Sequence, residues 1–406
     1  MVEGWWRRRQ ASAPILAPGA TLPPLTTQRP TLPVAPTLLG AFVLFGALWG
    51  AWQALLPELA GALELGEGAL GLMLTIGFAF AFPAMLATGR FMDRFGAGPA
   101  MAVSAVGMAA ALILVATAPG LPAVVAGVAL LVAASGAFDV AINASAMVNP
   151  AWSRPARLTL LHAGFSGGGA AGALAGGVAL GVGVPFSAGY VVVAATMVAF
   201  AAAALATRWP RSMRLGAPGA PPARLLAAAL VPLAVIAALA FLAEGSMESW
   251  AALYLRTVLG ASAFVGALGP AAFHLAMMSG RLVGAAVAGA LGARATLLVA
   301  GSATAAGMLV ALGVTLPAIA IPGLALAALG ASFVVPVVFS LAAARSGTDA
   351  GRAASYIMTL GYAGFLIGPS LIGLVAEAAG LRLALLVVPL AGAAVAIGSR
   401  SARSPG

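Results

Sequence analysis

Long apolar runs recur along nearly the whole chain, and they constrain its fold more than any other feature. A helix needs about 20 apolar residues to cross the hydrocarbon core of a bilayer, and many of these runs reach that length. Only 7% of the residues are charged, whereas soluble domains carry roughly 25% charged residues. A water-facing surface cannot be built from this composition, so the sequence predicts an all-α membrane protein.

An Arg- and Pro-rich linker at 207–224 divides the apolar segments into two sets. The segments lie near residues 37–57, 69–88, 98–118, 121–146, 157–181 and 185–206, and then near 230–255, 262–288, 294–315, 317–344, 353–376 and 381–399. We therefore expect about twelve transmembrane helices in two six-helix bundles, 37–206 and 225–399, joined by a cytoplasmic linker. Residues 1–36 are expected to form a disordered, basic and Pro-rich cytoplasmic tail, and 400–406 a second short tail.

Short sequence matches between the two sets indicate an internal duplication. Trp52-Gln53-Ala54-Leu55 matches Trp250-Ala251-Ala252-Leu253, and Gly68-Ala69-Leu70-Gly71 matches Gly266-Ala267-Leu268-Gly269, both at an offset of 198 residues. Ala163-Gly164-Phe165 matches Ala363-Gly364-Phe365 at an offset of 200. Paired halves of this kind place the substrate path near the pseudo-twofold axis between them. The two bundles are therefore expected to be pseudo-symmetric around a central path.

Arginine supplies all 20 basic residues, and their distribution predicts the topology. If the N-terminus is cytoplasmic, the inner loops and tails collect Arg7, Arg8, Arg9, Arg29, Arg90, Arg94, Arg154, Arg157, Arg208, Arg211, Arg214, Arg224, Arg294, Arg345, Arg352, Arg400 and Arg403. Only Arg256 and Arg382 fall on the outer side. The positive-inside rule then places both termini in the cytoplasm. The richness in Ala, Gly, Pro and Arg indicates a bacterial chain, so we expect a multi-pass protein of the bacterial inner membrane.

Composition and motif searches disfavour several other classes of protein. The net charge of +10 comes from Arg residues that flank apolar runs, which is a topology signal and does not indicate nucleic-acid binding. The chain has no Cys and two distant His, so neither a thiolate nor a structural zinc site is expected. Glycine clusters such as Gly167-Gly168-Gly169 lie inside apolar helices and do not form phosphate loops. We expect no enzymatic activity, cofactor or metal.

One motif lies in the loop after the second apolar segment. Gly89, Arg90, Asp93, Arg94 and Gly96 fall in the spacing G-x-x-x-D-R-x-G, which resembles the signature of the major facilitator superfamily between its second and third helices. The resemblance implies a cytoplasmic gate rather than a substrate site. The basic residues that usually follow are replaced by Ala97 and Gly98, and the second half keeps only the tail of the motif, Leu291-Gly292-Ala293-Arg294.

Further runs resemble a sugar-permease-like bacterial branch of that superfamily, the YbjJ type. They are Phe138-Asp139-Val140-Ala141-Ile142-Asn143-Ala144, His162-Ala163-Gly164-Phe165-Ser166-Gly167-Gly168, Glu244-Gly245-Ser246-Met247-Glu248-Ser249-Trp250 with Tyr254-Leu255-Arg256, and Gly280-Arg281-Leu282. The resemblance covers about 37–400. It implies two bundles that carry a small solute by alternating access.

The run from Gly364 to Gly373 is similar to the glycine-proline motif that drug:proton antiporters place in helix five. Here that motif falls in the eleventh segment, and the fifth has Gly168, Gly172 and Gly176 without the proline. Small residues at this spacing allow close helix packing. We interpret them as a rocking interface between the halves, and drug efflux stays an alternative.

Charged side chains in mid-membrane cost at least about 2.5 kcal/mol, so each needs a reason. The candidates are Asp139, His162, Glu244, Glu248, His274 and Arg281. Glu244 and His274 lie at similar depths and could share a proton, and Gly245 could loosen the helix between Glu244 and Glu248. Alternatively, Glu248 is interfacial beside Trp250, and His274 is a satisfied packing residue.

Asp139 and His162 are both expected in the cytoplasmic third of the membrane. They could form a proton relay. Alternatively, Asp139 is an ion-pair latch with Arg90, Arg94, Arg157 or Arg281. Asn143, one turn from Asp139, is a polar contact suited to either role.

Arg281 is expected to pair with an intramembrane acid or to bind an anionic substrate. Trp49, Trp52, Phe78, Trp250 and Tyr254 are candidate stacking surfaces for a solute. Aromatic belts at the membrane interface explain Trp52, Trp250 and Tyr254 equally well.

These observations predict a monomeric secondary transporter whose partners are the lipid bilayer, protons and a small-molecule substrate. The leading hypothesis is proton-coupled symport of a sugar-like or other small polar compound, with Glu244 and Asp139 as the first proton or substrate residues. Proton-coupled efflux of an amphipathic compound is the alternative within transport. A non-transporting membrane sensor is the alternative from another class.

Overall fold

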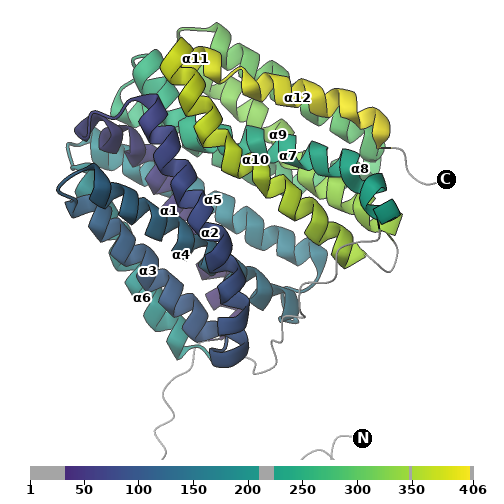
Figure 1. Ribbon diagram of the computed structural model, residues 1–406, viewed down its shortest axis with the longest axis horizontal. Coiled ribbons are helices and arrows are strands. Elements are labelled where there is room, and N and C mark those ends of the chain that lie inside the picture. The colour runs from purple at the N-terminus through teal and green to yellow at the C-terminus, as the bar shows by residue number, and fades with distance from the viewer. Residues whose placement is uncertain (1–32, 210–223, 347–349, 403–406) are drawn as a thin grey trace, which may run out of the picture. The chain divides into compact units, whose positions relative to one another are not determined.

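A computed structural model of the chain describes residues 33–209, 224–346 and 350–402, all within one compact unit that spans 32–406. Helices account for almost all of these residues (Figure 1). Residues 1–32 of the tail that is expected over 1–36 lie outside the described residues. The same is true of residues 210–223 in the expected linker and of 403–406 in the second tail.

Six long helices make up the described part of the first half. They are α1 (Val34–Ala62), α2 (Glu67–Phe95), α3 (Ala97–Thr117), α4 (Leu121–Val148), α5 (Pro155–Gly181) and α6 (Phe186–Ala206). Pro122 and Pro155 stand in the first turns of α4 and α5, where a missing N–H leaves no helical hydrogen bond unmade.

The second half follows the same plan. Its described elements are α7 (Arg224–Leu253), the π-helical turn η2 (Tyr254–Val258), α8 (Ala263–Gly313), α9 (Pro317–Ser346), α10 (Ala350–Ala379), α11 (Leu381–Ala384), α12 (Val387–Gly398) and the 3-10 turn η4 (Ser399–Ser401). The apolar stretch Leu381–Ser401 is long enough to form a single span.

Helix α8 is two transmembrane spans joined without a loop. Its 51 residues would extend about 76 Å at about 1.5 Å per residue, more than twice the roughly 30 Å of a bilayer core. Gly292 interrupts it with φ 76° and ψ 159°, a conformation that L side chains rarely adopt. The chain therefore crosses the membrane once over 263–291 and again over 293–313.

The described residues contain 11 helices that are long and apolar enough to span a membrane. With α8 counted twice, the described residues make twelve crossings, and the chain is a multi-pass membrane protein. The prediction of an all-α fold with about twelve transmembrane helices in two six-helix bundles is confirmed. Large apolar side chains such as Leu86, Val192 and Leu390 are more than 60% exposed, as a lipid-facing surface requires.

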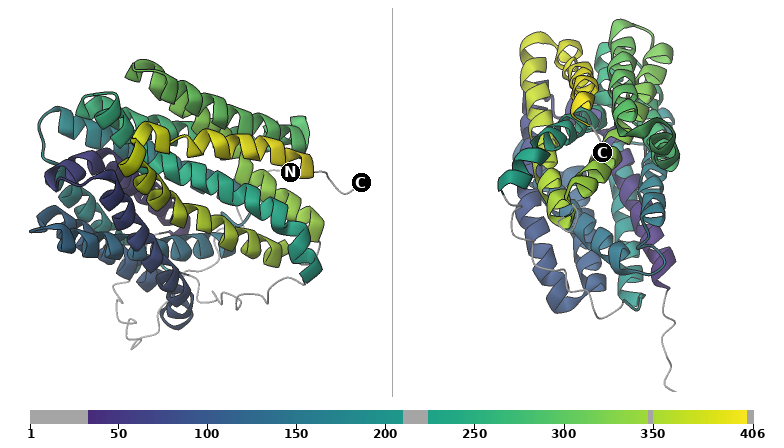
Figure 2. Two further views of the ribbon diagram at one scale, coloured as in Figure 1. Left: turned by 45° about the horizontal axis from the view of Figure 1, so that its top comes forward. Right: turned by 90° about the vertical axis from the view of Figure 1, so that its right-hand side faces the viewer.

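Contacts between helices separate the two bundles and define the surfaces that join them. In the first half α1 packs on α5, α2 on α4 and α3 on α6, and in the second half α7 packs on α10 and α8 on α9 and α12. The views in Figure 2 show the green-to-yellow helices of the second half side by side. The halves meet through α5 against α8 and α2 against α10.

Glycines make close contacts between helices, but some of these contacts lie elsewhere than the sequence predicts. Gly168 and Gly172 of α5 lie against the backbone of Val43 and Ala47 of α1, in the same half. Their expected place in a rocking interface between halves is therefore wrong. A close glycine contact between the halves does exist in α10, where Gly373 lies against Gly71 of α2.

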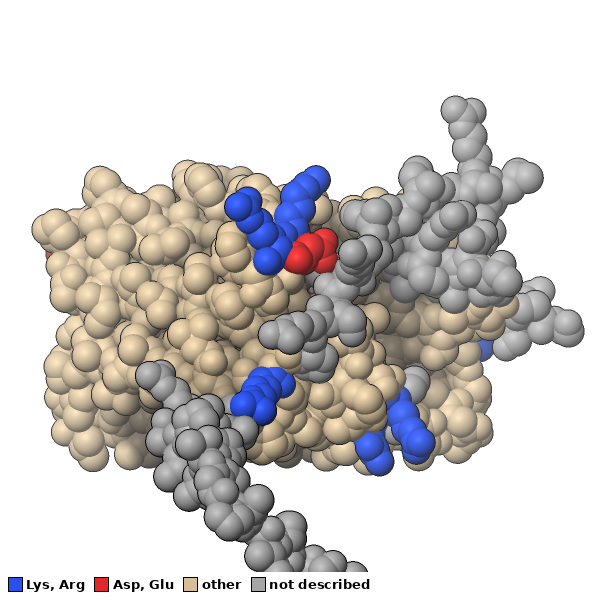
Figure 3. All heavy atoms as spheres, turned by 90° about the horizontal axis from the view of Figure 1, so that it is seen from below, with Lys and Arg blue, Asp and Glu red and all other residues tan. Residues whose placement is uncertain are grey.

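The two ends of the bundle differ in charge. Arg90, Arg94, Arg154, Arg294 and Arg400 are exposed near the ends of α2, α5, the second span of α8 and α12, and we call this side the Arg-rich end. Figure 3 shows basic groups spread over the face seen from below, with acidic groups beside some of them. The turn between α1 and α2 lies at the opposite end, because each span reverses the chain direction.

Candidate functional site

Arg281 of α8 links three helices near the middle of the bundle. Its Nη2 lies 3.2 Å from Oε1 of Glu244 on α7, and the side chains are 19% and 12% exposed. Its Nη1 donates to Ser166 Oγ at 2.6 Å and to the His162 carbonyl at 3.3 Å, both on α5. A charge-assisted hydrogen-bond network thus runs from the second half into the first.

Two glycines allow the helices around this network to approach closely. A Cβ at Gly280, next to Arg281, would overlap the Ser332 side chain of α9. A Cβ at Gly169 of α5 would lie 2.6 Å from the His274 ring. The glycines therefore fix how deeply Arg281 and His274 sit between the halves.

His274 and Gln53 form a second polar link across the halves. His274 Nε2 lies 3.1 Å from Gln53 Oε1 of α1, and the two residues are only 1% and 4% exposed. The Gln53 side chain also lies near the Glu248 carboxyl group on α7. Glu248 follows Glu244 by one helical turn, so the two carboxyl groups share a face of α7.

Asp139 and Asn143 form a third polar group on α4. Asn143 Nδ2 donates to Asp139 Oδ1 at 2.9 Å and to the Asp139 carbonyl at 3.0 Å. Tyr362 of α10 lies within electrostatic reach of both the Asp139 and Glu244 carboxyl groups. Its ring stacks on Phe241 of α7 with centroids 5.5 Å apart, which places aromatic surface beside the acids.

These side chains form one assembly, which we call the central polar cluster. Its members are Gln53, Asp139, Asn143, His162, Ser166, Glu244, Glu248, His274, Arg281 and Tyr362. The carboxyl groups of Glu244 and Glu248 lie within electrostatic reach of the single Arg281 guanidinium group, and Asp139 adds a third carboxyl group beside Tyr362. The cluster can therefore take up protons or another positive charge. Both halves contribute members, as a site between two repeats requires.

The two tryptophans that the sequence offers as stacking candidates differ in exposure. Trp250 is 0% exposed in the hydrophobic core, and its Nε1 has no hydrogen-bond partner among the described residues. Trp49 is partly buried on α1 and packs against the core. Of the two, only Trp49 has exposed surface.

The partners inside the cluster differ from those expected. Glu244 pairs with Arg281 and His274 with Gln53, so the expected Glu244 and His274 pair is not formed. Among the described residues, Asp139 bonds to Asn143 and forms neither the relay with His162 nor a latch with an arginine. His162 is exposed, and its ring packs edge-on against the Phe42 ring with centroids 5.3 Å apart.

Gly245 does not loosen α7, which is continuous from Arg224 to Leu253. A Cβ at Gly245 would lie 2.6 Å from the Phe365 ring of α10, so the glycine serves close packing. Helix α7 departs from α-helical geometry only beyond Leu253, at η2.

The gate motif of α2 is not latched to another described residue. Arg90, Asp93 and Arg94 are exposed, and Asp93 forms no ion pair within the described residues. Gly89 is partly buried, and Gly96 ends α2 with φ 89°, so that α3 follows without a loop. Gly292 has the same role in α8, which extends the sequence evidence for duplication to backbone geometry.

At the opposite end the halves are tied together. Arg256 Nη2 of η2 lies 2.5 Å from Glu58 Oε1 of α1. The Gly68 amide donates to Glu377 at 3.1 Å, and Ser370 Oγ donates to Thr75 Oγ1 at 2.6 Å, both between α2 and α10. The hydrogen bonds described between the halves therefore lie in the central polar cluster or toward the opposite end.

Glu58 and Arg256 occupy equivalent positions of the two repeats, because they are separated by the same 198 residues as the sequence matches. Equivalent positions related by a twofold axis touch each other only close to that axis. The Glu58 and Arg256 ion pair therefore lies close to the pseudo-twofold axis at this end.

Reversing the charge of Glu58 is expected to open this end. Glu58→Arg places two positive charges together, and an ion pair about 30% exposed contributes about 1 kcal/mol at most, so the open population should rise up to about fivefold. Because the chain has no Cys of its own, spin labels at Ala62→Cys and Leu383→Cys can report the distance across this end. The exchange variant Glu58→Arg with Arg256→Glu should restore the parent distances. Identical distance distributions in all three proteins would contradict a gate.

Sequence reasoning missed several members of the cluster and its surroundings. Gln53, Ser166 and Tyr362 carry no charge, so the cost of inserting a charge did not single them out. Each of the three is an isolated polar residue within an apolar segment, and this pattern is the sequence signal that could have identified them. Glu58 was overlooked because it stands near the end of its helix, where a charge costs little.

Comparison with known proteins agrees with this architecture. The family model described as Major Facilitator Superfamily matches residues 37–369. The membrane protein MosC of Rhizobium meliloti is 32% identical over 363 residues, which cover 88% of this chain and 87% of the relative. Among solved structures, the nucleoside transporter NupG has a TM-score of 0.71 at 14% identity and covers 90% of this chain and 98% of its own. The fucose:proton symporter FucP of E. coli has a TM-score of 0.60 at 17% identity, with coverages of 91% and 98%.

Proposed function

The chain belongs to the major facilitator superfamily, and from this premise we propose that it is a proton-coupled symporter of a small polar, sugar-like solute. The observation that carries the proposal is the Arg281 network, because it joins Glu244 of one half to Ser166 of the other. A proton on Glu244 removes the countercharge of Arg281 and loosens this link. Proton binding and the relative movement of the halves are thereby coupled.

The sugar-like class rests on the chemistry of the central polar cluster. Carboxyl and amide groups of Asp139, Asn143 and Gln53 suit hydroxyl groups, and the Phe241 and Tyr362 stack offers a flat apolar face. Among the solved neighbours, NupG is a nucleoside transporter and FucP is a fucose:proton symporter. We assign the chain to the sugar-permease-like YbjJ type of the superfamily.

A second candidate is proton-coupled efflux of an amphipathic compound. Further aromatic contacts that extend the stack favour it. The ring centroid of Phe365 lies 5.3 Å from that of Phe241 and 6.3 Å from that of Phe78 on α2. Such a surface would bind an apolar ring more readily than a hydroxylated one.

The proposed topology places the Arg-rich end in the cytoplasm of a bacterial inner membrane, as the positive-inside rule requires. Both termini are then cytoplasmic, and the protein works as a monomer. The tied opposite end and the unlatched motif of α2 correspond to a state that opens inward. The two bundles, 37–206 and 225–399, are the moving bodies.

The test is solute-driven proton entry into proteoliposomes that contain a pH-sensitive dye. Pooled sugars should acidify the lumen, and Glu244→Gln should abolish the signal, because glutamine cannot release a proton at this position. A response to pooled lipophilic cations alone would favour efflux. Silence with both pools from folded protein would contradict proton coupling and favour a sensor.

A further inference from the structure

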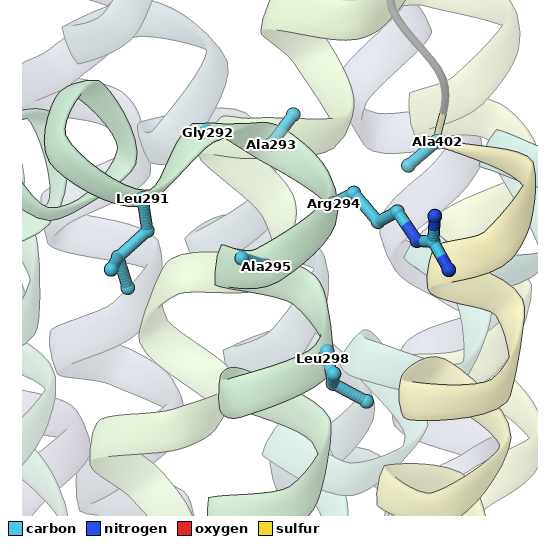
Figure 4. Close-up of a pocket in the computed structure, with 7 residues that line it drawn as sticks. All are labelled: Leu291, Gly292, Ala293, Arg294, Ala295, Leu298 and Ala402. Carbon is cyan, nitrogen blue, oxygen red and sulfur yellow. The ribbon is translucent and has the colours of Figure 1, made fainter.

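A groove of about 610 Å³ opens at the Arg-rich end of the second half. It is lined by Leu291, Gly292, Arg294, Ala295, Leu298 and Ala402, and it lies between the break in α8 and the end of the described chain (Figure 4). The positive φ of Gly292 turns the chain sharply here, where the first span of α8 ends and the second begins. The groove therefore lies at a backbone break that is part of the fold.

Arg294 is the charged residue of the groove. Figure 4 shows its side chain extended toward the helical ribbon that precedes Ala402. It is exposed and forms no ion pair with another described residue. Leu291 and Leu298 beside it are both 49% exposed. Leu298 follows Arg294 by four residues, so it lies one helical turn deeper on the same face.

The surroundings of the groove are positive. Arg400 is exposed, and Arg345 donates to the Ser401 carbonyl at 2.6 Å. The described acids of this half, Glu244, Glu248 and Glu377, lie in the central polar cluster or at the opposite end. The remaining acid of this half, Asp349, is outside the described residues.

The remaining segments of this chain offer little countercharge for the groove. Arg403 is the charged residue after Ala402, the segment 1–36 has one acid among several arginines, and the segment 207–224 has no acid. A bilayer, in contrast, surrounds the protein and presents anionic phosphate groups at this depth.

We propose that the groove binds an anionic phospholipid, with the lipid phosphate at Arg294 and an acyl chain along Leu298. The arrangement suits both parts of a lipid, because the Arg294 cation at the rim faces the headgroup and the apolar surface of Leu298 one turn deeper faces the acyl chain. This site is separate from the central polar cluster, and the proposal does not depend on the transported solute.

The test compares Arg294→Gln with Arg154→Gln, which removes an exposed charge from the same end of the other half. Each purified protein is titrated with phosphatidylglycerol and with phosphatidylcholine, and bound lipid is counted by native mass spectrometry. Arg294→Gln should weaken phosphatidylglycerol binding about fivefold, as expected for one basic residue near an anionic headgroup. Arg294→Lys should retain most of the binding, and Arg154→Gln should match the parent.

Equal phosphatidylglycerol binding by Arg294→Gln and the parent would overturn the proposal. Equal binding of the two lipids by the parent would do the same, because the groove would then recognise only acyl chains. Neither result would bear on proton coupling at Glu244.

Discussion

Arg281→Gln is expected to lower solute-driven proton transport by about a hundredfold or more. The substitution leaves the Glu244 carboxylate without its countercharge, and breaking a buried pair typically costs about 3–5 kcal/mol. It also removes the hydrogen bond to Ser166, which joins α8 to α5. The measurement is the initial rate of dye response in proteoliposomes, normalised to folded protein.

Two further variants separate a mechanistic role from a structural one. Arg281→Lys keeps the charge but loses the planar fork that reaches Glu244 and Ser166 together, so it should retain folded protein with a reduced rate. The double variant Arg281→Gln with Glu244→Gln removes both charges and should recover thermal stability without recovering proton coupling. If the double variant regained coupled transport, the pair would be a structural device and the mechanism proposed here would be wrong.

The number and order of the helices could be predicted because length and apolarity alone decide whether a segment spans a bilayer. The break in α8 was anticipated in the same way, since the apolar runs near 262–288 and 294–315 were already separate. Only the absence of a loop at Gly292 was unexpected. It is a backbone property that sequence periodicity does not report.

The partners within the central polar cluster were harder to predict. Glu244 and His274 were placed together from their depths, but depth along a helix does not give the direction of a side chain around it. Helices α7 and α8 are antiparallel. Glu248 is farther than Glu244 from the Arg-rich end, so Glu248 lies at the level of His274 and Gln53. Glu244 is then level with Arg281.

Duplication explains a further part of the architecture. Glu58 and Arg256 are equivalent positions that meet, and Gly96 and Gly292 are equivalent turns with similar backbone angles. In contrast, the central polar cluster is not symmetric, because α7 carries Glu244 and Glu248 where the first repeat has Gly46 and Gly50. The first half uses these positions for packing and the second half uses them for charge.

Gly50→Val is expected to destabilise the protein by about 3 kcal/mol, at the upper end of the usual cost of overpacking. A Cβ at Gly50 would overlap the Gly169 carbonyl of α5, and a Cβ at Gly46 would overlap the Phe165 carbonyl. These neighbours are backbone atoms of a helix, which cannot rotate away as a side chain can. The two helices must therefore separate, and the Gly169 contact with His274 is disturbed as well. The measurement is the thermal midpoint of monomeric protein in detergent, followed by size-exclusion chromatography.

Gly40→Val on the same helix is the matched control, because a Cβ at Gly40 meets nothing within 4 Å. Both substitutions add the same β-branched side chain to α1, so they share any effect of helix propensity. The difference between their midpoints therefore measures the contact between α1 and α5 alone. Gly50→Ala should fall between the parent and Gly50→Val, since even one methyl group meets the α5 backbone. Equal midpoints for the valine variants at Gly40 and Gly50 would mean that α1 and α5 can move apart without cost, and the rigid first half that alternating access needs would lose its support.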